Sequence, residues 1–188
     1  MNVENAAVGL VALNGGELVG RTRAQKVAYL LDRCGAHFGL RFTYHHYGPY
    51  CFELANGLDA ARVEGRIEHK EKLSARHGVP YSIFTSAGDE GDLIDLGGLP
   101  AAEARKLLRR MKNESDIVLE LAATAVFLRD EWHYYGKDKV AAADATDAAV
   151  DETKRRKSRK ATPERLEKAL ALLRDLGLAE TPAPAGSR

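Results

Sequence analysis

The segment from Thr22 to Gly35 limits the possible folds of this chain more than any other part of its sequence. Thr22 and Gln25 have the Thr-x-x-Gln spacing of a capping box, which is typical of the first turn of a helix. Gly35 stands where a helix C-terminus favours glycine. The apolar side chains between them recur at i, i+3, i+4 and i+7, at Val27, Leu30, Leu31 and Cys34. The pattern predicts a helix whose apolar stripe must be covered by other elements.

Two more helices and a hairpin are predicted around this segment. Residues 6–13 have the spacing of a short buried helix, which ends at the sequence Asn14-Gly15-Gly16. Pro49 suits the first position of a third helix. The apolar face of that helix would comprise Cys51, Leu54, Ala55, Leu58 and Ala61. Residues 67–69 and 79–83 alternate between apolar and polar, which predicts a β-hairpin. Three small helices followed by a hairpin is the element order of a winged helix.

The second half of the chain is predicted to be helical. After a glycine-rich acidic loop at 88–100, apolar spacing indicates a helix over 104–111. Ser115 can cap a further helix, whose wide apolar face up to Leu128 suits a central position. Thr162 and Pro163 begin the last helix.

These patterns predict a mainly α-helical fold with a small β-hairpin. Residues 1–98 would form a winged-helix-like half, and residues 99–178 a helical half with a basic linker at 151–161. Residues 179–188 would be a disordered tail. Because the chain has 188 residues, 45% of them hydrophobic, both halves are expected to form one compact domain.

Charge and cysteine content narrow the function classes. The formal net charge is +1, so attraction to nucleic acid would need a local cluster of cations. The two cysteines form no disulfide framework, and no N-terminal stretch combines a basic start with an apolar run, which favours the cytoplasm. The longest uncharged stretch, 121–128, is too short to span a membrane, so no membrane partner is expected.

No motif of catalysis or of cofactor binding is present. The six histidines lack the spacing of zinc ligands, so no metal site is predicted. The acidic loop lacks the spacing of an EF-hand, and the glycines match neither a Walker phosphate loop nor a dinucleotide fingerprint. The sequence therefore predicts a protein that is not an enzyme and has no cofactor. An enzyme without a recognisable motif remains a third alternative.

An aromatic and histidine cluster precedes the third helix. Such side chains anchor many protein interfaces, although they also brace loops against a core. Phe52 is one residue off the apolar stripe of that helix, so we expect it to be partly exposed or packed on a neighbouring segment. The predicted partner-binding residues are Tyr44, His45, His46, Tyr47, Tyr50 and Phe52.

A basic run near the C-terminus is open to two interpretations. It can contact nucleic acid, or it can be a solvated linker before the last helix. The exposed side of the third helix is poor in lysine and arginine, so that helix is a weak candidate for reading DNA. The candidate nucleic-acid contacts are Lys154, Arg155, Arg156, Lys157, Arg159 and Lys160.

The helix containing Gln25-Lys-Val-Ala-Tyr-Leu-Leu31 and the turn Tyr47-Gly-Pro-Tyr50 resemble the bacterial YwgA-like family and, more distantly, the Panacea-domain (SocA-like) antitoxins. The resemblance covers roughly residues 8–85 well, and Cys51 stands where relatives often have serine. The motif positions are Lys26, Tyr29, Tyr47, Gly48, Pro49 and Tyr50.

The resemblance implies a compact helical protein that acts through protein contacts, often by neutralising a toxin. We therefore expect a non-enzymatic protein-binding module, antitoxin-like or regulatory, with a protein partner that can be a toxin. A winged-helix DNA-binding regulator is the alternative. The tyrosine-glycine-proline turn can be either scaffold or binding groove.

Overall fold

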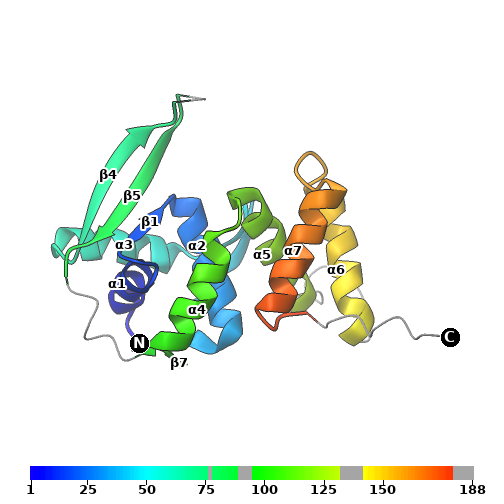
Figure 1. Cartoon of the computed structure of the whole chain (residues 1–188), viewed down its shortest axis with the longest axis horizontal. Coiled ribbons are helices and arrows are strands. Elements are labelled where there is room, and N and C mark those ends of the chain that lie inside the picture. The colour runs from blue at the N-terminus through cyan, green and yellow to red at the C-terminus, as the bar shows by residue number, and fades with distance from the viewer. Residues whose placement is uncertain (76–77, 89–94, 132–141, 180–188) are drawn as a thin grey trace.

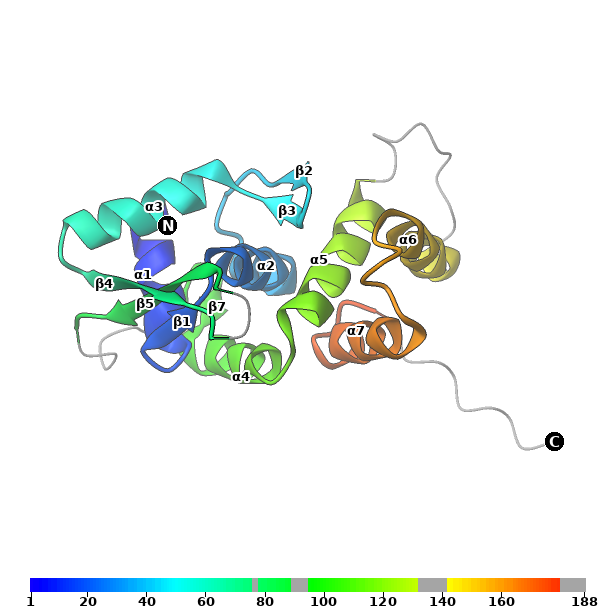
Figure 2. The same ribbon diagram turned by 90° about the horizontal axis from the view of Figure 1, so that it is seen from above.

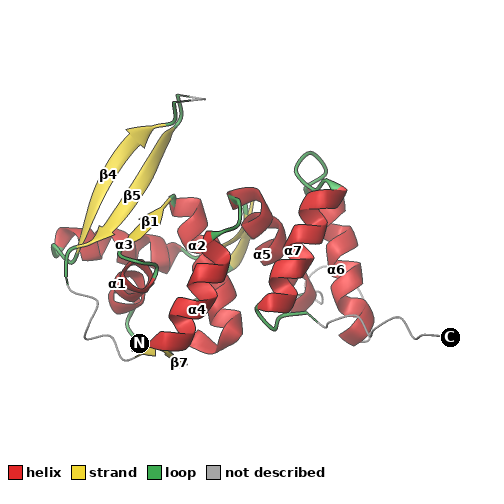
Figure 3. Ribbon diagram, in the orientation of Figure 1, coloured by secondary structure: helices red, strands yellow, loops and turns green. Residues whose placement is uncertain are grey.

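The computed structural model describes residues 1–75, 78–88, 95–131 and 142–179. This part of the chain is mainly helical, with seven α-helices and small antiparallel sheets of two or three strands (Figure 1). Figure 3 shows that helices dominate everywhere except in an arm formed by two strands. None of the helices described is long and apolar enough to span a membrane.

The N-terminal half contains three helices and most of the strands. Its helices are α1 (Val3–Leu13), α2 (Arg21–Leu31) and α3 (Phe52–Val63), and α2 continues into a π-helical turn, η1 (Asp32–Ala36). Its strands are β1 (Glu17–Val19), β2 (Thr43–His45), β3 (Gly48–Tyr50), β4 (Ile67–Leu73) and β5 (Pro80–Ser86).

The predicted hairpin is confirmed and belongs to a sheet of order β1-β5-β4. Leu18 pairs with Phe84 across β1 and β5, and both side chains are buried, as is Ile67 at the start of β4. Beyond Ile67 most of β4 is exposed, and β4 and β5 extend away from the body as an arm (Figure 1). The three residues of β1 are too few for alternation to predict the strand.

From Asp95 onward, the described chain adds a small hairpin and four helices. The hairpin is formed by β6 (Asp95–Leu96) and β7 (Leu99–Pro100), inside the segment that was predicted to be a loop. The helices are α4 (Ala101–Lys112), α5 (Asp116–Asp130), α6 (Ala142–Arg156) and α7 (Pro163–Asp175). Every residue from Val118 to Leu128 is buried, and α5 lies between α2 and the α6–α7 pair (Figure 2). The prediction of a central helix is confirmed.

Arg23 of α2 connects the two halves. Its guanidinium donates to the carbonyl oxygens of Glu114 at 3.0 Å and Met111 at 2.9 Å, at the end of α4. The same group pairs with Asp116 at 2.7 Å, in the first turn of α5. One side chain thus satisfies carbonyls that a helix end leaves unpaired and fixes the start of the next helix.

Two predictions about helix starts are wrong. Gly20 precedes α2 and no side chain caps it, so the capping box does not form. Gln25 is buried instead, where its amide accepts from the Cys51 N–H at 2.8 Å and donates to the Cys51 carbonyl at 2.9 Å. Pro49 lies in β3, and α3 begins after Cys51, whose sulfur accepts from the Leu54 N–H at 3.4 Å. The thiol therefore caps α3 where a serine hydroxyl would.

The predicted basic linker is in large part a helix. Residues 151–156 belong to α6, and Lys157 is buried, because Glu152 and Glu120 neutralise cations that a charge run would otherwise keep in solvent. Of the predicted tail, residues 180–188 lie outside the described part of the chain.

Candidate binding surfaces around the β2–β3 hairpin

The β2–β3 hairpin is seated directly on α5. Gly48, the first residue of β3, has a φ of +86°, and a Cβ there would lie 2.6 Å from the Thr124 hydroxyl oxygen. Glycine is therefore needed both for the left-handed backbone and for the contact. The next nearest side-chain atom is the Cε of Lys26 on α2, at 3.7 Å.

Lys26 of α2 holds the same strand, β3, from a second side. Its ammonium is almost fully buried and donates to the Pro49 carbonyl at 2.6 Å. Burial lowers the pKa of Lys26 from 10.5 to about 8; Glu120 opposes the shift, and Lys157 and Lys160 add to it. The two motifs of the resemblance, on α2 and in the turn, are thus joined by this hydrogen bond.

Strand alternation divides the predicted partner-binding cluster into two surfaces. Tyr44 points toward α5, with its ring centroid 5.9 Å from that of Phe127. His45, the next residue, is on the opposite face, with its ring 5.1 Å from Tyr50 and 5.4 Å from Phe52. The sequence interpretation had treated these residues as one surface.

We call His45, Tyr50 and Phe52 the aromatic patch. Phe52 is 58% exposed, as expected from its position beside the stripe, and its ring meets Tyr50 edge-on at 5.0 Å. Glu53 follows in the first turn of α3 and is exposed, and its carboxylate accepts from the Cys51 thiol at 3.1 Å. The patch is therefore a group of touching rings at the start of a helix, with a carboxylate beside it.

The other predicted partner-binding residues face the predicted nucleic-acid residues. The Arg156 guanidinium lies 5.2 Å from the Tyr44 ring, and the Lys160 ammonium lies 4.7 Å from the Tyr47 ring. Lys157 donates to the carbonyl of His46. These residues enclose a cavity of about 630 Å³, which we call the basic pocket. Its lining consists of Tyr44, His46, Tyr47, Glu120, Arg156, Lys157, Ser158, Arg159 and Lys160.

Two carboxylates hold most of the basic run in place. Glu120 on α5 is 3% exposed and lies 2.9 Å from the Lys157 ammonium and 2.6 Å from that of Lys160. Glu152 on α6 pairs with Arg155 at 2.6 Å and with Arg156 at 2.7 Å. The hydrogen bond from Arg155 is the largest of the effects that lower the pKa of Glu152 from 4.5 to about 2.

The remaining cations of the run are Lys154 and Arg159. Within the described ranges, neither forms an ion pair, and both are exposed. They differ in position, because Arg159 lines the basic pocket and Lys154 does not.

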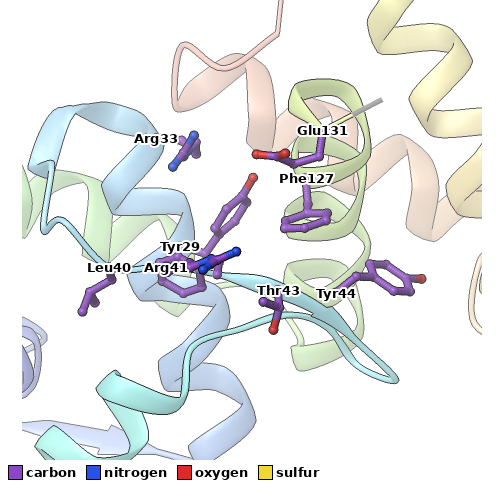
Figure 4. A pocket seen from close by; sticks show the side chains of 9 residues that line it. Tyr29, Arg33, Leu40, Arg41, Thr43, Tyr44, Phe127 and Glu131 are labelled. Carbon is purple, nitrogen blue, oxygen red and sulfur yellow. The ribbon is translucent and has the colours of Figure 1, made fainter. Parts of the chain in front are cut away.

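A second cavity, of about 410 Å³, lies on the other side of Tyr44. Its wall includes Tyr29, Arg33, Phe127 and Glu131, and Figure 4 shows the Tyr29 side chain directed toward the space between Arg33 and Glu131. Burial raises the pKa of the Tyr29 hydroxyl far above its ordinary value. Arg33 is held by Asp32 at 2.9 Å and faces Asp130 at 3.8 Å. The positive charge of Arg33 is thus balanced by carboxylates that lie beside this cavity.

Several residues that shape these surfaces were not singled out by the sequence interpretation. They are Glu120, Thr124 and Glu152. Of these residues, only Glu120 stands out in the sequence, because it is a single carboxylate within the apolar run 117–128. Over the residues that the structure describes, no three histidine, cysteine or acidic side chains gather as metal ligands would.

Comparison with known proteins finds one informative similarity. No family model matches the sequence. The chain is 28% identical over 132 residues to the uncharacterized protein YwgA of Bacillus subtilis (strain 168), a match that covers 68% of this chain and 78% of YwgA.

Proposed function

We propose that the protein is a non-enzymatic, protein-binding module of the YwgA-like family that binds its partner through the aromatic patch. The observation behind this proposal is the exposure of Phe52. Its side chain is 58% exposed although the rings of His45 and Tyr50 lie in contact with it. Phenylalanine and tyrosine contribute large contact areas with little loss of rotamer freedom, so exposed rings in contact favour a binding surface.

The fold supports a protein partner more than DNA. With η1 and the β2–β3 hairpin inserted between α2 and α3, the order α1-β1-α2-α3-β4-β5 and the sheet order β1-β5-β4 support the proposal of a winged-helix-like half, in which α3 would be the recognition helix. In this chain the outer face of α3 presents Phe52 and Glu53, and Asp59 pairs with Arg21 at 2.7 Å. Phosphates would meet a carboxylate and a phenyl ring at the start of α3, and the one cation of this helix, Arg62, lies in its last turn, whereas a protein surface with cations would be attracted.

The role of the partner follows from the resemblance to the YwgA-like family and the Panacea-domain antitoxins. We propose an antitoxin-like or regulatory role, in which the patch covers a surface of a toxin or of another regulated protein. The 28% identity to YwgA supports the family assignment. A partner with lysine or arginine beside an apolar residue would match the rings and Glu53.

The proposal is tested with the small proteins encoded beside the gene for this chain. Each is co-expressed with the chain, scored for growth inhibition that the chain relieves, and measured for binding by calorimetry. We expect one neighbour to bind, and Phe52→Ala to weaken that binding by at least about 30-fold, or about 2 kcal/mol.

Val63 supplies the matched control. It is on the same helix and is 79% exposed, but it lies at the opposite end from the patch. Val63→Ala should leave the affinity unchanged. Equal affinities of Phe52→Ala and the unmodified protein for the partner would refute the role of the patch. A loss of about 3–5 kcal/mol in the unfolding free energy of Phe52→Ala would refute it as well, because a loss of that size is typical of a phenylalanine in the core.

A further inference from the structure

We propose that the basic pocket binds a small phosphorylated ligand with a planar ring, of the size of a mononucleotide. This inference does not rest on the proposed function, because the pocket and the aromatic patch lie on opposite faces of β2. It rests on the charge balance of the pocket, its shape and its aromatic wall.

Positive charge in the pocket exceeds the negative charge that faces it. Four cationic side chains line it against one carboxylate, Glu120, which Lys157 and Lys160 share. Arg156 shares Glu152 with Arg155, and Arg159 has no ion pair within the described part of the chain. A bound dianion would balance this excess, and Arg159 is free to form the paired hydrogen bonds that arginine makes with phosphate.

The lysines are held in place before any ligand binds. Glu120 orients both ammonium groups, and Lys157 is fixed further by the His46 carbonyl. A preorganised cation loses little conformational freedom when an anion arrives, which favours binding of a compact ligand.

The wall beside these cations is aromatic. Tyr47 is 50% exposed and lines the pocket together with Tyr44, so the exposed part of its ring offers a planar ligand a surface on which to stack. The volume of about 630 Å³ lies within the usual range of small-molecule sites and leaves room for more than a phosphate group.

The same arrangement favours a small ligand over a nucleic acid. Duplex binding needs several phosphate contacts spread along a surface, with cations available to neutralise them. Here the unpaired cation that faces the pocket is Arg159, and the other unpaired cation of the run, Lys154, lies outside it. One concave site therefore suits one phosphorylated molecule.

The test uses the full chain and calorimetric titration with five probes at about 150 mM salt. The probes are inorganic pyrophosphate and the four common ribonucleoside diphosphates. We expect at least one diphosphate to bind 10-fold or more tightly than pyrophosphate. No binding by any probe would overturn the proposal, and equal affinity for pyrophosphate and every nucleotide would overturn the role of the ring.

Matched variants locate the site. Arg159→Ala should weaken the nucleotide at least 10-fold, while Lys154→Ala, which removes an exposed and unpaired cation of the same run, should change it less than 2-fold. Tyr47→Ala should reduce nucleotide affinity to that of pyrophosphate. Thermal melting of each variant should match the unmodified protein, since all three side chains are at least half exposed or unpaired.

Two results would contradict a specific pocket. Equal losses for Arg159→Ala and Lys154→Ala would mean general attraction to positive charge. Tight binding of a duplex oligonucleotide that depends on Lys154 as much as on Arg159 would assign the run to nucleic acid. Phe52→Ala should leave nucleotide binding intact, so failure of this proposal is distinguishable from failure of the aromatic patch.

Discussion

The two ends of this molecule bury side chains of different chemistry: apolar ones at one end, and several charged ones at the other. Where α1 and α3 pack on the sheet, the largest buried side chains are apolar, such as Leu10, Leu58 and Phe84. Where α2, α5 and α6 meet the β2–β3 hairpin, Lys26, Glu120, Glu152 and Lys157 are buried beside the apolar core. Apolar packing is sufficient to form a fold, so the charges at the second end indicate a demand for a defined geometry there. We call the region where α2, α5 and α6 meet the β2–β3 hairpin, and where these four charged side chains are buried, the seam.

The largest expected effect comes from removing the shared carboxylate of the seam. Glu120→Ala leaves Lys157 buried without its ion-pair partner, and we expect a loss of about 3–5 kcal/mol in unfolding free energy, measured in urea. The double variant Glu120→Leu with Lys157→Met should recover most of that loss, because it removes the buried charge of Lys157 together with that of its partner. A single variant as stable as the unmodified protein would mean that the seam tolerates an unpaired lysine and differs little from the apolar end.

Lys26 gives the seam a dependence on pH that the apolar end lacks. Its pKa is about 8 in the folded protein and near 10.5 when unfolded, so between these values the unfolded state binds more protons. Stability therefore rises with pH across this window, by at most about 3 kcal/mol for a shift of this size.

Lys26→Met isolates this contribution. The unfolding free energy of the unmodified protein minus that of Lys26→Met should increase from pH 7.5 to pH 11. Taking the difference cancels Cys34 and Cys51, whose pKa values burial raises to about 11 and whose effect has the opposite sign. A difference that stays flat with pH would contradict the lowered pKa.

A comparison of alanine variants at two glycines tests how closely the hairpin must approach α5. Gly48 and Gly65 both have positive φ, +86° and +71°, but a Cβ at Gly65 meets nothing within 4 Å. Gly65→Ala should cost about 1 kcal/mol for the backbone alone, and Gly48→Ala about 2–3 kcal/mol because Thr124 is also in contact. Equal costs in urea melts would show that the contact with Thr124 relaxes freely.

The smallest effect is expected at the surface of the seam. The Arg155 side chain is 70% exposed although it pairs with Glu152, so Arg155→Ala should lower the unfolding free energy least of all these variants. The loss should shrink further in high salt. A loss that persists at 1 M salt would mean that Arg155 stabilises through packing.

The contrast also explains which parts of the structure the sequence could predict. Helix periodicity in 22–35 and 117–128 and alternation in the β4–β5 hairpin are local patterns, and each was interpreted correctly. The basic pocket joins Tyr44 to Arg156, more than a hundred residues later, and no local pattern records that contact. The thiol cap of α3 and the redirected Gln25 were missed because a capping box looks the same whether or not its side chains are used elsewhere.

The hydrogen bond between Lys157 and the His46 carbonyl joins residues 111 positions apart in the chain. Contacts of such separation form late in folding, since a long loop must close before they contribute. During synthesis the N-terminal helices and sheet can assemble while α6 is still absent, and the hairpin then lacks the lysine that holds its turn. Substitutions at this contact should therefore accelerate unfolding more than they slow folding. The basic pocket would be the last part of the molecule to form.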